Sequence, residues 1–521
     1  MKVERTKNAA RNIRAGFILK IYQVLMPFVM RTVLLYTLGV EYLGLGSLFA
    51  SIIRVLNLAE LGVGSAMVYS MYRPIAEDNE EEICALMRLY RLYYRVIGLL
   101  VLLVGLGCLP FIPRLIKGDV PSDVSVYVLY LLNLGATVLS YWLFAYRNCL
   151  LDAHQRVDVA SRIRFAISLL QTVLQIIALV VFRNYYVYLI LNIIAQIVIN
   201  ILTAFTTTKM YPAFRPRGKL DPAVTAAINR RVRDLFTSKL GGVILNSADT
   251  IVVSAFLGLT ALAVYQNYYN IVTSVIGLVA IIFGACTAGI GNSLIVESPQ
   301  KNFGDLKKFA LIIAWIAGFC TCALICLFQP FMELWTRGTK LMLELPAGVS
   351  FGLYFYIHEI NMLLNLFKDA AGIWHEDRFR PLVTALTNLT LNLIMVQFIG
   401  IYGVLYSTVI ATLFIGMPWL LHNLFTNLFD KRYLPGFVRT LLFYAGVTAA
   451  AAALTGGLSV LVPGGALVKL LVRGVIVLIV PNLVFLVVYR TRPEFKDVLI
   501  LADRVLGGRL GRLLKGRGGL L

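Results

Sequence analysis

Charged residues are scarce in this sequence of 521 residues, and the motifs of common enzymes are missing. Only 14% of the residues are charged and 59% are hydrophobic, whereas soluble globular domains are about 25% charged and about 45–50% apolar. The sequence contains no Walker phosphate loop, no GxSxG nucleophile motif and no zinc-protease motif. These absences exclude a soluble globular protein and leave an ATPase or hydrolase without catalytic residues. We therefore predict an integral membrane protein that is not an enzyme.

Patterns typical of metal sites are also missing. The four histidines are scattered, and the densest group of the seven cysteines is FCTCALIC, with Cys320, Cys322 and Cys326. On a helix, neighbours two residues apart point to different faces, which is poor geometry for a shared metal ion. We predict no metal site and no cofactor, although transport could be coupled to H⁺, to Na⁺ or to the membrane potential.

Long hydrophobic runs dominate what is present. Fourteen segments of about 18–28 residues are each long enough to cross a bilayer as a helix. Short connections such as VFRNYY and IGIYG make consecutive helices antiparallel neighbours, and the segments lack the alternation of barrel strands. The predicted fold is an all-α polytopic membrane protein. Its predicted helices occupy residues 15–39, 43–66, 94–116, 124–146, 160–182, 184–206, 233–258, 262–290, 306–328, 347–367, 380–398, 402–424, 438–460 and 467–489.

Basic residues are distributed unevenly between the two sides of these helices. With a cytoplasmic N-terminus, 37 lysines and arginines lie in cytoplasmic segments and only five on the opposite face. The positive-inside rule then places both termini in the cytoplasm. The same loops explain the net charge of +21 without nucleic acid, as topology signals that contact anionic lipids. Residues 1–14 are expected to be a retained cytoplasmic leader, and residues 490–521 a basic cytoplasmic tail.

A faint internal repeat divides the helices. LGVEYLGLGS, which starts at Leu38, resembles LGLTALAVYQ, which starts 219 residues later at Leu257. Two parallel six-helix repeats enter the membrane in the same orientation, an architecture that suggests a substrate site between two lobes and alternating access. The offset predicts an N-lobe, a basic cytoplasmic linker, a C-lobe and an extra helix pair at 15–206, 207–232, 233–424 and 438–489, respectively.

Two arginines lie inside the first two predicted helices. Arg54 is near the middle of its segment, where arginine costs about 2.5–3.5 kcal/mol on insertion scales. Arg31 lies at a similar depth on the neighbouring helix. Snorkelling to the interface or a structural ion pair would account for either residue. Alternatively, both face a water-filled cavity, where the planar guanidinium can bind phosphate through two hydrogen bonds.

The second predicted lobe has its own polar residues. Asp249 lies at a depth comparable with that of Arg31, and the same helix carries Asn246. The stretch HEINMLLN places His358, Glu359 and Asn361 close to mid-membrane. Ionisable groups at this depth are candidates for substrate or ion coupling, and structural ion pairs are the alternative.

The stretch YQNYYN opens the predicted helix at 262–290. Gln266 and Asn270 stand there among several tyrosines. Amide and aromatic groups suit sugar recognition, whereas an aromatic belt at the membrane interface is the alternative for the tyrosines.

Several stretches carry a family resemblance. LLYTLGVEYLGLGSLFASIIRVLNLAELGVGSAMVYSMYRPIAEDNEEEI resembles the first two helices and following loop of Wzx-type lipid-linked oligosaccharide flippases. These flippases form the polysaccharide transporter branch of the multidrug/oligosaccharidyl-lipid/polysaccharide (MOP) exporter superfamily. YRNCLLDAHQR, SADTIVVSAFLGLTALAVYQNYYNIV and GACTAGIGNSL are also similar to the family, so the resemblance covers most of residues 10–424. It implies two six-helix bundles around a central cavity, often with two extra helices.

The resemblance also implies a substrate and its partners. The implied substrate is an undecaprenyl-diphosphate-linked oligosaccharide repeat unit, which moves from the inner to the outer leaflet of a bacterial-type cell membrane for surface polysaccharide synthesis. Arg31 and Arg54 match the cationic residues implicated in diphosphate binding, and a polysaccharide polymerase is a further expected partner. Two other classes stay open: a cation-coupled drug or metabolite antiporter, which would favour an acidic cavity, and a membrane scaffold, which would not need buried charges.

Overall fold

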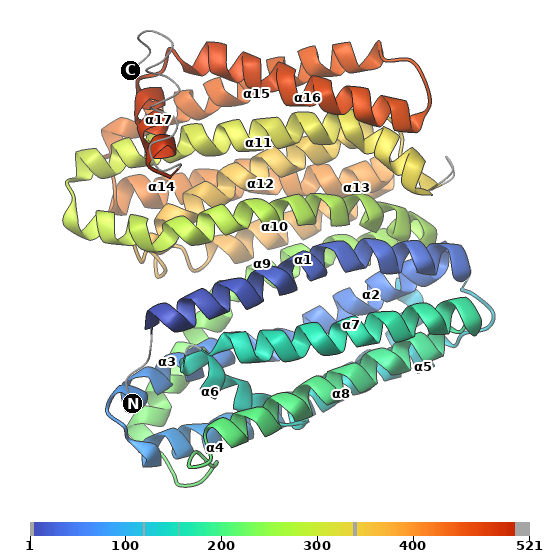
Figure 1. Ribbon diagram of the computed structural model, residues 1–521, viewed down its shortest axis with the longest axis vertical. Helices are drawn as coiled ribbons and strands as arrows, with labels where there is room; N and C mark the ends of the chain where they lie inside the picture. Colours follow the sequence, from blue (N-terminus) through green and yellow to red (C-terminus); the bar gives the residue numbers. More distant parts are fainter. Residues whose placement is uncertain (1–4, 118–119, 155, 337–340, 506–521) are drawn as a thin grey trace. The chain divides into compact units, whose positions relative to one another are not determined.

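The structure is a computed structural model that describes residues 5–117, 120–154, 156–336 and 341–505. These residues are predominantly helical and contain no strand (Figure 1), which confirms the predicted all-α class. The chain forms two compact units, Met1–Ala263 and Val264–Leu521, which we call unit 1 and unit 2.

Unit 1 contains nine α-helices and the first residues of a tenth. Their starts follow local capping rules: Asn79 accepts a hydrogen bond from the Glu82 N–H at the start of α4, and Asp221 caps α9 just before Pro222. The helices are α1 (Arg5–Thr37), α2 (Val40–Leu56), α3 (Val63–Ala76), α4 (Glu80–Cys108), α5 (Val126–Trp142), α6 (Asn148–Ala153), α7 (Val157–Val181), α8 (Tyr185–Met210) and α9 (Pro222–Leu257).

Unit 2 contains most of α10 and the remaining helices. Helix α11 packs against α12, α15 and α16, so it lies at the centre of this unit. The helices are α10 (Leu259–Val296), α11 (Pro299–Thr336), α12 (Pro346–Ala370), α13 (Arg380–Ala411), α14 (Met417–Asn427), α15 (Leu434–Val460), α16 (Ala466–Tyr489) and α17 (Pro493–Val505).

A helix occupies every predicted membrane segment in the described residues. The predicted pair 380–398 and 402–424 is separated inside α13, where Ile399 and Gly400 have non-helical dihedral angles. By length and apolarity, ten helices in the described part of the chain could cross a membrane, or eleven if one bent pair forms a single span. The total of fourteen spans therefore stays a prediction.

The repeat predicted from the sequence is supported by the backbone of its two turns. Gly39 has a φ of 123° and Gly258, its counterpart 219 residues later, has a φ of 92°. In both turns the glycine N–H donates to a carbonyl five residues earlier, that of Leu34 (3.1 Å) or Val253 (3.2 Å). Only glycine adopts this conformation without strain. The predicted lobe boundaries stay a prediction, and α9 packs within unit 1, against α2 and α3.

The second predicted segment, 43–66, is broken rather than continuous. Helix α2 ends at Leu56, a 3₁₀ turn covers Asn57–Glu60, and Gly62 (φ 86°) starts α3 in the left-handed region. The counterpart helix of the second repeat, α10, runs without interruption over Leu259–Val296. In transporters, interrupted helices supply backbone ends to substrate and ion sites, so this break directs attention to the residues around it.

The orientation in the membrane is open to a direct test. We expect reporter fusions at Thr208 and Arg490 to report the cytoplasm and one at Gly338, outside the described residues, to report the exterior. The reason is the 37-to-five distribution of basic residues. Paired phosphatase and fluorescent reporters at the three positions provide the measurement. An external Thr208 would contradict the two-lobe assignment.

Candidate functional site

Arg54 lies at the broken helix end. It is in the last turn of α2, and its side chain is exposed on the surface of the protein. The C-terminus of a helix carries partial negative charge, which favours a cation at this position. An arginine that is exposed near mid-membrane gains most by meeting water or an anion there. The anion-binding role of Arg54 stays a prediction.

A half-buried acid lies in the break itself, at the end of the 3₁₀ turn, and sequence reasoning missed it. Glu60 accepts hydrogen bonds from the hydroxyls of Tyr94 (2.7 Å) and Tyr141 (2.8 Å), and Tyr90 donates to Tyr94 (2.8 Å). Tyr141 is also 2.9 Å from Asn57 Oδ1, so these contacts hold both ends of the 3₁₀ turn. The available signal was an acid six residues after Arg54 in a hydrophobic run.

The structure brings three of the predicted residues into unit 1. Helix α2, which carries Arg54, packs against α1 and α9, which carry Arg31 and Asp249. Arg31 is half-buried and donates from Nη2 to the Ala263 carbonyl (3.3 Å). Asp249 is buried, with 8% of its surface exposed. It therefore belongs to the same compact unit as the two arginines. The side chain of Asn246 lies outside the described residues.

Unit 2 holds a second buried acid, on α12. Glu359 is 1% exposed, and within the described residues neither of its carboxylate oxygens has a hydrogen-bond partner. The Nδ1 of the half-buried His358 is 3.4 Å from Glu359 Oε1, so these sequence neighbours do contact one another. The side-chain oxygen of Asn361, two residues further along α12, is also buried without a hydrogen-bond partner in this part of the structure. A buried carboxylate without donors is costly, so this group is suited to bind a proton or a cation.

Gln266 and Asn270 are half-buried residues of α10, whereas Glu359 lies on a different helix, α12. Of the tyrosines beside them, Tyr265 and Tyr268 are at most 1% exposed, and both pack on Phe351. They form part of the core of unit 2 rather than an open sugar-binding surface. In the described residues, no group of three or more His, Cys, Asp or Glu side chains is placed to hold a metal ion.

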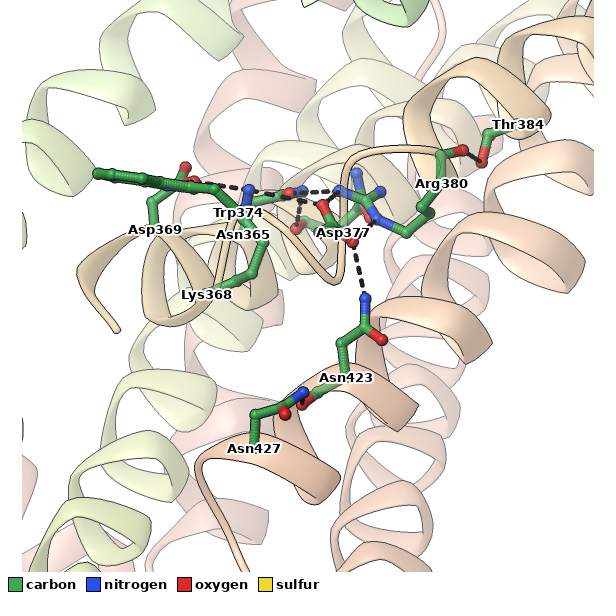
Figure 2. Close-up of polar contacts among 10 residues, drawn as sticks. Asn365, Lys368, Asp369, Trp374, Asp377, Arg380, Thr384, Asn423 and Asn427 are labelled. Atoms are coloured by element: carbon green, nitrogen blue, oxygen red, sulfur yellow. Dashed lines mark hydrogen bonds and ion pairs between the residues drawn. The ribbon is translucent and has the colours of Figure 1, made fainter. Parts of the chain in front are cut away.

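A buried polar cluster joins the ends of α12, α13 and α14 in unit 2 (Figure 2). Arg380 forms two hydrogen bonds to Asp377, from Nε (2.6 Å) and Nη2 (2.7 Å), and Nη2 also donates to Asn365 (2.8 Å). Asn423 donates to Asp377 (3.1 Å). We call this the loop cluster; its labelled members are Asn365, Lys368, Asp369, Trp374, Asp377, Arg380, Thr384, Asn423 and Asn427.

The loop cluster corrects one expectation about the basic loops. Lys368 and Arg380 were expected to be topology signals that contact anionic lipid, but they are only 8% and 6% exposed. Lys368 Nζ contacts Asp369 Oδ1 (2.6 Å) and Asp377 Oδ2 (3.5 Å). Counting charges along the sequence does not reveal burial. The cluster fixes three helix ends to one another and leaves these two cations little access to lipid.

Comparisons with known proteins agree with this architecture. The chain covers 99% of the structure "Lipid II flippase MurJ, inward closed conformation", over 93% of its own length, with 16% identity and a TM-score of 0.66. It covers 99% of an inward-facing multidrug resistance MATE family transporter of the MOP superfamily (81% of this chain, 15% identity, TM-score 0.60). A MOP superfamily transporter from Pyrococcus furiosus is also similar (82% of this chain, 96% of that chain, 14% identity, TM-score 0.51).

The fold of the chain is thus that of MOP superfamily transporters and flippases. No curated protein matches the sequence. The sequence model of one family, described as polysaccharide biosynthesis protein, matches residues 9–290, which is more than half of the chain. This multi-pass membrane protein therefore belongs to the polysaccharide biosynthesis protein family.

Proposed function

We propose that the protein is a flippase that moves an undecaprenyl-diphosphate-linked oligosaccharide from the inner to the outer leaflet of a bacterial-type cell membrane. The observation that carries the proposal is the broken second span, in which α2 ends at Leu56, inside the predicted segment 43–66, with the exposed Arg54 in its last turn. Membership of the polysaccharide biosynthesis family and the MOP fold support it.

The proposed mechanism is alternating access without covalent chemistry. Arg54, with Arg31, binds the diphosphate in an inward-open state and releases it when the site opens outward. The planar guanidinium forms paired hydrogen bonds to phosphate oxygens. Binding must differ between the two states, because a site that holds the diphosphate equally well in both shifts no equilibrium. Each negative charge that moves outward across 100 mV gains about 2.3 kcal/mol.

The buried acids are proposed to couple transport to a proton or cation. We expect Asp249→Asn or Glu359→Gln to reduce export severalfold while insertion into the membrane stays normal. Glu359 lacks hydrogen-bond donors among the described residues, so the neutral amide costs little folding energy and removes only the ion-binding group. Surface polysaccharide per folded transporter is the measurement. Full export by both single variants would remove these acids from the mechanism.

A deletion strain tests the function itself. Without the protein, lipid-linked oligosaccharide should accumulate on the cytoplasmic leaflet and surface polysaccharide should fall. Expression of the wild-type protein should restore both. If the lipid-linked pool and the surface polysaccharide are unchanged in the deletion strain, the proposed substrate is wrong.

A further inference from the structure

Two cations lie on the first turns of α16, within the last predicted membrane segment. Lys469 and Arg473 are four residues apart and therefore share one face of the helix. Arg473 is seven residues from the helix start at Ala466, a depth of about 10 Å at 1.5 Å per residue. The positive-inside assignment places this end of α16 at the outer surface.

These cations line a cavity of about 420 Å³ between α16, α11 and the segment that leads into α12. Glu333 and Glu344 line the same cavity. Among the described residues neither cation forms an ion pair, and the Arg473 guanidinium makes only a long hydrogen bond from Nη1 to the Cys326 carbonyl (3.5 Å). Its Nε is buried without a partner in the same residues. Both cations and both carboxylates thus retain capacity for a ligand.

The wall of the cavity is held in place by hydrogen bonds. Gln329 of α11 donates from Nε2 to the carbonyls of Leu343 and Glu344, each at 2.9 Å. The hydroxyl of Tyr268 donates to Gln329 Oε1 (3.2 Å) and accepts from the Leu343 N–H (3.2 Å). Because Tyr268 belongs to the aromatic core, this network ties the cavity wall to the body of unit 2. The cavity is a built feature of the fold.

An apolar groove is lined by another face of the same turns of α16. Val468, Val472 and Ile476 of α16 line a space of about 520 Å³ together with Leu458 and Leu461. These positions alternate with Lys469 and Arg473 along the helix. Leu461 is 76% exposed and Val468 is 50% exposed on the protein surface, which in a membrane is in contact with lipid.

We propose that the cavity and groove bind one phospholipid of the outer leaflet whose headgroup carries both a phosphate and a primary amine. Lys469 and Arg473 bind the phosphate, Glu333 and Glu344 accept from the ammonium, and an acyl chain lies in the groove. Charge complementarity selects this headgroup. An anionic headgroup without an amine leaves the carboxylates facing negative charge, and a trimethylammonium group has no N–H to donate.

Native mass spectrometry of the purified full chain in detergent tests this site. Phosphatidylethanolamine, phosphatidylglycerol and phosphatidylcholine with identical acyl chains serve as probes. We expect phosphatidylethanolamine to be retained at least about fivefold better than the other two lipids. Equal retention of the three lipids would show only general contact with headgroups and would overturn the proposal, as would a preference for phosphatidylglycerol.

Two variants test the phosphate-binding cations and the ammonium-binding carboxylates separately. Arg473→Gln should lower retention of phosphatidylethanolamine about tenfold, the loss expected for one charge-assisted hydrogen-bonding partner. Glu333→Gln combined with Glu344→Gln should abolish the preference over phosphatidylglycerol. Arg490→Gln, at the opposite end of the same helix, is the matched control and should bind as the wild type does. Unchanged retention by Arg473→Gln with an unchanged elution profile would overturn the proposal, which is independent of the transported substrate.

Discussion

Replacing Arg54 with alanine is expected to lower export per folded molecule by about tenfold or more. Under the proposed mechanism, the alanine variant loses a charge-assisted, two-pronged contact to phosphate, which is worth about 1.5–3 kcal/mol. Arg54→Lys keeps the charge but loses the planar fork, so it should retain partial export. The measurement is surface polysaccharide divided by the amount of folded transporter in the membrane.

The same measurement distinguishes substrate binding from a structural role. Arg217→Ala removes an exposed arginine from the loop between α8 and α9 and serves as the matched control, with export expected near the wild-type level. If Arg54 is only structural, Arg54→Ala lowers the amount of folded protein but leaves export per folded molecule unchanged. That result would refute diphosphate binding by Arg54.

Replacing Arg380 with methionine is expected to destabilise unit 2 by about 3–5 kcal/mol, because it leaves the buried Asp377 without its two-pronged partner. Asp377 would retain Asn423 and the longer contact to Lys368, at 3.1 and 3.5 Å. Heating the purified protein in detergent and following the monodisperse fraction measures the loss as a lower midpoint.

A double-mutant cycle identifies the origin of that loss. Asp377→Asn combined with Arg380→Met should be less destabilising than the sum of the single changes, by about 0.5–3 kcal/mol, since the two residues contact one another. Glu376→Gln, which neutralises the neighbouring exposed acid, should leave the midpoint unchanged. Additive single effects would contradict the ion pair at the centre of the loop cluster.

Much of the fold could be predicted from sequence because membrane helices are specified by length and apolarity, which a sequence displays directly. The turns at Gly39 and Gly258 could also be predicted from the sequence, because the repeated motif marks positions that require positive φ. The interruption of the helix after Leu56 could not be predicted in this way. The polar residues Asn57 and Glu60 do not by themselves mark a break, and the tyrosines that donate hydrogen bonds to Glu60 lie far away in the chain.

The candidate site was predicted in part. Arg31, Arg54 and Asp249 were recognised because an ionisable residue stands out in a hydrophobic run, and the structure places them on packed helices of one unit. Glu60 was not predicted to be functional, because it lies near the end of its predicted segment. The burial of Arg380 escaped notice because a charge count treats every basic loop residue as exposed. Partners distant in sequence decide such cases, and they become visible only in the folded chain.

The central claim is tested most directly by reconstituting the purified protein in sealed vesicles and measuring, leaflet by leaflet, where an undecaprenyl-diphosphate-linked oligosaccharide resides. The account predicts that wild-type vesicles move the lipid from the inner-facing to the outer-facing leaflet, and that vesicles with the Arg54→Ala variant move it at least about tenfold more slowly. Equal leaflet exchange in wild-type, Arg54→Ala and protein-free vesicles would contradict the account.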